Sequence, residues 1–128
     1  METLTHTFPC GPKAVGDARR ALDALNATVS GTQLEELRLM VSELVTNSVR
    51  HADSKSSASV GLDVHLNADV LRVEVVDEGT GFDPKARTSE QDKGSGWGLF
   101  IVEQLASDWG VKKNSRTRVW FEVPRQTA

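Results

Sequence analysis

The spacing of apolar residues along the chain changes between a helical repeat and a strand-like alternation. The helical repeat, with apolar residues three or four positions apart, covers the segments 14–25, 32–52 and 98–109. Apolar and polar residues alternate in the segments 3–8, 59–66, 70–76 and 118–123. The pattern therefore predicts three helices and four strands.

Short polar segments predict where these elements begin and end. Asn67-Ala68-Asp69 separates two alternating segments and predicts a hairpin between them. Thr32 and Glu35 have the spacing of a capping box and predict the start of the second helix. Residues 77–95 are rich in glycine, proline and charge, and a connection of that length is usually functional.

The order of the elements predicts an α+β fold. Helices come early, strands follow in the middle, and one helix and one strand close the chain. We expect helices packed on one face of a mixed, largely antiparallel sheet, in a single domain over residues 1–128. A chain of 128 residues suffices for one hydrophobic core but not for two ordinary domains.

Composition and charge exclude several other classes of protein. Apolar residues make up 38% and charged residues 26%, which is typical of a globular chain. The formal net charge of -3 gives no reason to expect direct binding to nucleic acid or to an anionic membrane. No apolar run reaches the roughly 20 residues that a membrane span needs. Cys10 is the only cysteine, so no internal disulfide can form, and we expect a cytoplasmic protein.

The first candidate site lies on the second predicted helix, where Glu43, Asn47, Arg50 and His51 share a strip opposite much of the apolar stripe. The carboxylate of Glu43 can take a proton from a hydroxyl group or from water. The side-chain oxygen of Asn47 suits Mg²⁺, which keeps most of its waters and needs few protein ligands. A solvated helix face would have the same composition, so this strip alone does not decide between the two interpretations.

The second candidate site is the segment Asp77-Glu78-Gly79-Thr80-Gly81-Phe82, directly after an apolar strand. The carboxylate of Asp77 at the strand end can accept a hydrogen bond from an exocyclic amine such as that of adenine. Gly79 and Gly81 allow the backbone to turn sharply or to approach a ligand closely. A plain Asp/Gly turn is the alternative.

The third candidate site is the glycine-rich segment 94–99, Gly94-Ser95-Gly96-Trp97-Gly98-Leu99, at the start of the last predicted helix. Backbone N–H groups at a helix N-terminus favour a phosphate. The segment is neither a Walker A loop nor a dinucleotide-binding fingerprint. Taken together, a base and metal ligand, an adenine-binding carboxylate and a phosphate cradle describe one ATP site.

The three segments resemble the N, G1 and G2 boxes of the GHKL superfamily of ATPases, whose ATP-binding domain has the Bergerat fold. Within that superfamily the chain most resembles the small bacterial anti-sigma factor serine/threonine kinases. Their N box typically reads Glu-Leu-Val-x-Asn followed by His-Ala, as in segment 43–52, and their last helix opens Gly-Leu-x-Ile-Val, as in segment 98–102. The resemblance covers about residues 3–124.

The resemblance implies a role for each matching residue. Glu43 would be the general base on the acceptor hydroxyl, Asn47 would bind Mg²⁺, and Asp77 would bind the adenine amine. Thr117 would lie near the adenine, although the glycine that often precedes this Thr in the family is Arg116 here. The other matching positions would line the ATP site: Arg50, His51, Gly79, Gly81, Phe82, Gly94, Ser95, Gly96, Trp97, Gly98 and Leu99.

The family implies an ATP- and Mg²⁺-dependent kinase that phosphorylates a Ser or Thr of an anti-anti-sigma (STAS) protein. It also implies sequestration of an RNA polymerase sigma factor, usually by a homodimer. Two other functions stay open. One is a non-catalytic ATP-gated binding module. The other is a detached histidine-kinase catalytic domain, although none of the three histidines lies in a helical hairpin suitable as a phosphoacceptor.

Overall fold

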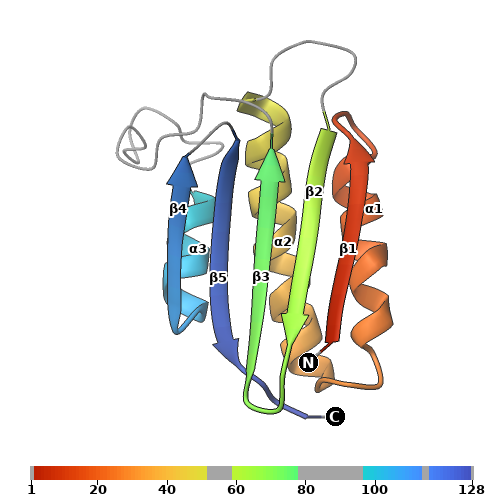
Figure 1. The fold of residues 1–128 in the computed structure, drawn as a ribbon, viewed down its shortest axis with the longest axis vertical. Helices are drawn as coiled ribbons and strands as arrows, with labels where there is room; N and C mark the ends of the chain where they lie inside the picture. Colours follow the sequence, from red (N-terminus) through yellow and green to blue (C-terminus); the bar gives the residue numbers. More distant parts are fainter. Residues whose placement is uncertain (1, 52–58, 78–96, 114–115, 128) are drawn as a thin grey trace.

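A five-stranded antiparallel sheet forms the front layer of the molecule in Figure 1. The computed structural model describes residues 2–51, 59–77, 97–113 and 116–127. In spatial order across the sheet, the strands are β1 (Glu2–Pro9), β2 (Ser59–Leu66), β3 (Val70–Asp77), β5 (Thr117–Pro124) and β4 (Asp108–Lys113). Every pair of neighbouring strands runs antiparallel.

The helices form the second layer, behind the sheet in Figure 1. They are α1 (Ala14–Ala21), which continues into the short 3-10 helix η1 (Leu22–Leu25), α2 (Gly31–His51) and α3 (Trp97–Leu105). All three α-helices cover the same face of the sheet, and the other face carries no helix among the described residues. The predicted α+β architecture is therefore confirmed.

The alternation along the strands separates the two faces of the sheet. Leu62 and Val64 of β2 and Phe121 of β5 point toward the helices and are almost fully buried. Their neighbours along the strands, such as Asp63 and Glu122, are half-buried on the opposite face, the open face of the sheet. The central helix α2 contributes Leu37, Val41 and Leu44 to the core between the layers, and none of these is more than 1% exposed. The hydrophobic effect thus fixes which face of each strand the helices cover.

The hairpin predicted at Asn67-Ala68-Asp69 is confirmed. The side-chain oxygen Oδ1 of Asn67 accepts hydrogen bonds from the backbone N–H groups of Asp69 and Val70, each at 2.8 Å. An Asn side chain that bonds its own following backbone stabilises a tight turn. This turn sets the register in which Asp63 lies opposite Glu74 and His65 lies opposite Arg72.

The capping box predicted at Thr32 and Glu35 is wrong. Helix α2 begins at Gly31, and the residue before it, Ser30, accepts a hydrogen bond from the N–H of Gln33 at 3.1 Å. Ser30 therefore occupies the N-cap position, while Thr32 lies within the first turn. Glu35 pairs with Arg38 instead of reaching back to the backbone.

The third predicted helix extended too far, to Trp109, and the strand that begins at Asp108 was not predicted. Helix α3 ends at Leu105, and the N–H of Ser107 already donates to the carbonyl oxygen of Glu122 on β5 at 2.9 Å. Strand β4 follows at the sheet edge, with Trp109 and Val111 opposite Phe121 and Val119 of β5. The apolar positions here fit a helical repeat and a period-two repeat equally well. Because they continue the helical repeat that precedes them, the prediction extended the helix over residues that form a strand.

None of the helices in the described part of the chain is long and apolar enough to cross a membrane.

Candidate functional site

Asn47 is the most unusual buried residue of the described structure. It lies in the last two turns of α2 with 2% of its surface exposed. Neither its side-chain oxygen Oδ1 nor its nitrogen Nδ2 has a hydrogen-bond partner in the described part of the chain. A buried amide without partners costs about 1–3 kcal/mol, so such groups need an explanation.

The strip predicted to lie opposite the apolar stripe is only partly correct. Arg50 is exposed and Glu43 is half-buried, but Asn47 points into the protein interior. The reason is that α2 packs against the sheet and also against α1 and α3, so its buried arc is wider than one stripe. His51 is the last residue of α2, and only its backbone is described.

Two further polar residues are buried at the ends of neighbouring strands. Asp77 is the last residue of β3, Thr117 is the first of β5, and the two lie directly opposite each other in the ladder. Only 5% of Asp77 and 2% of Thr117 is exposed. Asp77 also lies opposite Val60, which is fully buried, so its side chain is on the helix-facing side of the sheet. The pairing places these two predicted site residues beside each other.

The same end of the sheet collects the elements that carry the predicted site. Figure 1 shows the last turns of α2 behind the upper ends of β3 and β5, with the start of α3 beside them. The four elements that carry the described site residues therefore meet at this end of the sheet: α2 with Glu43 and Asn47, β3 with Asp77, β5 with Thr117 and α3 with Leu99. Leu99 belongs to the hydrophobic core, with 8% of its surface exposed.

Most residues of the two predicted glycine-rich loops lie outside the described residues. These are Gly79, Gly81, Phe82, Gly94, Ser95 and Gly96. Trp97 and Gly98 begin α3, and only their backbone is described. Their predicted contacts with adenine and phosphates stay predictions.

The described groups fit a magnesium nucleotide. Asn47 offers a neutral oxygen with no competing partner, and Glu43 lies four residues earlier, one helical turn away. The carboxylate of Glu43 forms no ion pair within the described residues. The neutral oxygen of Asn47 matches the few protein ligands that Mg²⁺ uses when phosphates supply the rest. The carboxylate of Glu43 is left available as a base.

A second polar cluster, which was not among the predicted sites, lies on the open face of the sheet. Asp63, His65 and Glu74 each place one ligand atom within 4.8 Å of the others. The period-two alternation and the hairpin at Asn67 contained the signal, because together they put these residues on one face of paired strands.

Comparison with known proteins extends the similarity over most of the chain. Residues 8–123 match the family described as histidine kinase-like ATPase domain. A serine-protein kinase RsbW of Listeria innocua is 31% identical, over 84% of this chain and 77% of the relative. The serine-protein kinase RsbW of Bacillus velezensis is 32% identical, over 93% of this chain and 83% of the relative.

A solved structure shares the fold. The catalytic domain of the histidine kinase ThkA superposes with a TM-score of 0.56, covers the whole of both chains and is 13% identical. At that identity the likeness concerns the arrangement of helices and strands alone.

Proposed function

This chain belongs to the family of histidine kinase-like ATPase domains and, within it, to the serine-protein kinases. We propose that it transfers the γ-phosphate of ATP to a serine or threonine of a small anti-anti-sigma (STAS) protein. One observation carries the proposal. The buried amide of Asn47 lacks a hydrogen-bond partner among the described residues, one turn after the half-buried carboxylate of Glu43. This pair supplies a metal ligand and a base side by side.

Each described polar residue of the site takes a part in the proposed reaction. Asn47 would hold Mg²⁺, which when bound neutralises charge on the phosphates. Asp77 accepts a hydrogen bond from the adenine amine, and Thr117 beside it contributes to the same pocket. Glu43 takes the proton from the acceptor hydroxyl, in a reaction that depends mainly on positioning and charge stabilisation.

The family resemblance extends the proposal to the partners. It adds a sigma factor that the protein sequesters, a homodimeric state and a cytoplasmic setting. The relatives named above are serine-protein kinases, which supports the acceptor class, a protein hydroxyl, over a histidine.

Replacement of Glu43 by Gln tests the proposed chemistry. Glu43→Gln keeps the shape of the side chain but removes the base, so we expect phosphotransfer to a STAS protein to fall at least about 100-fold. ATP affinity should stay close to wild type. Glu36→Gln is the matched control, because Glu36 is half-buried on the same face of α2, two turns earlier. Phosphotransfer is measured with γ-labelled ATP and the affinity by calorimetry.

The outcomes separate the candidate functions. Undiminished transfer by Glu43→Gln would rule out Glu43 as the base. If the wild-type protein transfers no phosphate but binds its partner more tightly with ATP than with ADP, the ATP-gated binding module is the correct function. A partner phosphorylated on histidine would instead indicate a histidine-kinase catalytic domain.

A further inference from the structure

The open face of the sheet carries a charged network, on the side opposite the helices and the buried residues of the candidate ATP site. Arg72 of β3 donates to Glu74 at 2.7 Å and to Glu122 at 2.9 Å, and Arg118 of β5 pairs with Glu74 and, at 3.5 Å, with Asp63. The guanidinium group of Arg72 also lies over the ring of Trp120, 4.1 Å from its centroid. These contacts hold the side chains in fixed positions on the sheet.

The network has one negative charge in excess. Three carboxylates, those of Asp63, Glu74 and Glu122, face two guanidinium groups. Asp63 is the most weakly held of the three, because its one ion pair within the described residues is the 3.5 Å contact with Arg118. Burial tends to raise the pKa of Glu74, but hydrogen bonds from Arg72 and Arg118 outweigh it and hold that pKa below its usual value.

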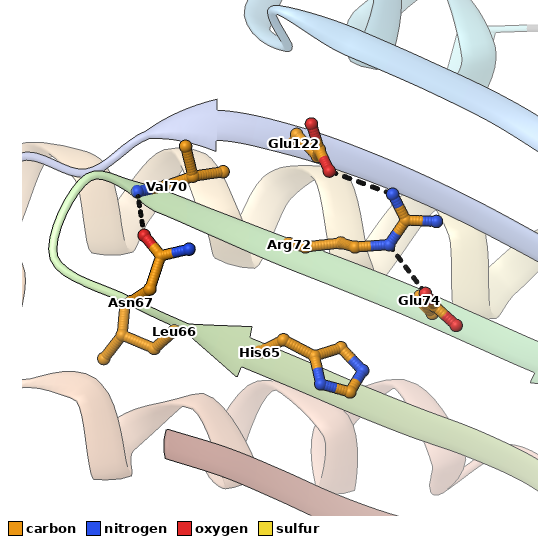
Figure 2. Close-up of a pocket in the computed structure, with 7 residues that line it drawn as sticks. All are labelled: His65, Leu66, Asn67, Val70, Arg72, Glu74 and Glu122. Carbon is orange, nitrogen blue, oxygen red and sulfur yellow. Dashed lines mark hydrogen bonds and ion pairs between the residues drawn. The ribbon is translucent and has the colours of Figure 1, made fainter. Parts of the chain in front are cut away.

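His65 completes a set of metal-binding groups beside this excess charge. Its ring reaches from β2 toward the carboxylate of Glu74 on β3 (Figure 2), and a ligand atom from each of Asp63, His65 and Glu74 lies within 4.8 Å of the other two. The Nδ1 atom of His65 is 3.4 Å from the hydroxyl oxygen of Thr3 on β1. A hydrogen bond at Nδ1 orients the ring and leaves Nε2 as the metal ligand.

We propose that Asp63, His65 and Glu74 form a binding site for a divalent transition-metal ion of the zinc type on the open face of the sheet. One imidazole nitrogen and two carboxylate oxygens are ligands that Zn²⁺ accepts in sites with three protein ligands. Tetrahedral bonds of about 2.0–2.2 Å require ligand atoms about 3.4 Å apart, so the widest pair has to approach by at most about 1.4 Å. We expect the half-buried side chains of Asp63 and His65 to make this movement when the ion binds.

The two arginines complement the ion rather than exclude it. Each carboxylate oxygen has two lone pairs, so Glu74 can keep its hydrogen bonds to Arg72 and Arg118 while it binds metal. Hydrogen bonds of that kind orient the ligands of metal sites.

An open space adjoins the cluster. His65 and Glu74 of the cluster line this space together with Arg72 and Glu122 (Figure 2), and its volume is about 370 Å³. Water or a small anion can reach the ion through it. The cluster lies on the face of the sheet opposite the helices, whereas Asn47 and Asp77 lie between the layers. The ion therefore takes no part in phosphoryl transfer, and the proposal is independent of the kinase proposal.

Cobalt titration of the full chain, without nucleotide or Mg²⁺, tests the site. We expect one equivalent of Co²⁺ to give a saturable visible absorption band that Zn²⁺ abolishes by competition. His65→Gln and Asp63→Asn should each weaken binding at least about tenfold. His6→Gln is the control, because His6 lies on the helix-facing side of β1, stacked on Phe8, and should leave the affinity unchanged.

A second measurement covers the case in which a variant does not fold. In the wild-type protein, Zn²⁺ should shift the imidazole ¹⁵N resonance of Nε2 of His65 and leave that of His6 in place. The absence of a saturable band, equal affinity of wild type and His65→Gln, or a shift confined to another histidine would each overturn the proposal.

Discussion

The two ends of α2 carry the same chemical group in opposite circumstances. Gln33 in the first turn and Asn47 in the last turns each have a side-chain amide, and each residue is 2% exposed. The Nε2 atom of Gln33 donates to the carbonyl oxygen of Pro124, and its Oε1 accepts from the N–H of Gln126, both at 2.8 Å. The amide of Asn47 has no such partner in the described part of the chain.

The difference in hydrogen bonding distinguishes a buried amide that stabilises the fold from one that is available to a ligand. Gln33 ties the end of β5 to the start of α2, so the fold itself accounts for its burial. A buried amide without partners lowers stability. Among the described residues, such an amide lies at the end of the helix where Asp77 and Thr117 are also buried. The comparison therefore supports the proposed ligand-binding role of Asn47 without reference to any motif.

Asn47→Leu should break the comparison most strongly. Leucine has a similar branched shape but no polar atoms, so the nucleotide-free protein should be as stable as wild type or more stable. At MgATP concentrations about 100 times its Kd, wild type should gain about 2.7 kcal/mol, and the variant should lose this gain. Thermal unfolding with and without MgATP measures both effects. A variant that is destabilised without nucleotide yet still responds to MgATP would contradict the assignment.

Gln33→Met should have the opposite outcome at the other end of the helix. Methionine fills the same volume but leaves the carbonyl of Pro124 and the N–H of Gln126 without their partner, so we expect a loss of about 2 kcal/mol of unfolding free energy. The stabilisation by MgATP should be the same as in wild type. Urea unfolding at neutral pH measures the loss. If the stability is unchanged, water replaces the amide and the contrast between the two ends is weaker than argued.

Glu74→Gln extends the comparison to a third buried polar group. Glu74 differs from Gln33 and Asn47 because its partners are the charged side chains of Arg72 and Arg118. Hydrogen bonds from Arg72 and Arg118 lower its pKa despite burial, so its contribution to stability is present above the unfolded-state pKa of about 4.3. That contribution is lost as the pH falls through the lower folded-state pKa. We expect the variant to lose about 1.5 kcal/mol at pH 7 and progressively less below about pH 4.

Unfolding free energies at several pH values, measured for both proteins, check this expectation. Glu103→Gln on the exposed side of α3 is the matched control and should show no such pH-dependent difference. A difference for Glu74→Gln that does not change with pH would show that packing, and not charge, is responsible.

Much of the fold could be predicted from the sequence because most strands have one buried face. The alternation in β2 and β3 follows directly from a sheet covered on one side, and the Asn67 turn fixes their register. The edge strand β4 was missed because Trp109 and Val111 also fit the helical repeat of α3. Local spacing cannot distinguish these outcomes when tertiary pairing with β5 decides between them.

The site was predictable in its residue types but not in its burial. The motifs placed Glu43, Asn47, Asp77 and Thr117 in one site, and the structure brings them to one end of the sheet. The prediction put Asn47 on an outward strip, because a helix pattern read alone has only one buried stripe. Because α2 contacts α1, α3 and the sheet, the position of Asn47 is buried. The periodicity of one helix holds no information about these neighbours.

Ser30→Ala should have the smallest effect of the set and concerns the Gln33 end of α2. The hydroxyl of Ser30 accepts from the N–H of Gln33, so its loss should cost about 1 kcal/mol of unfolding free energy. Thr32→Ala is the matched control, because the capping box predicted from the sequence would make Thr32 the cap and reverse the ranking. Urea unfolding of both variants decides between them. A larger loss for Ser30→Ala, with the MgATP response intact in both, would show that the first turn of α2 stabilises the fold while the last turns serve the ligand.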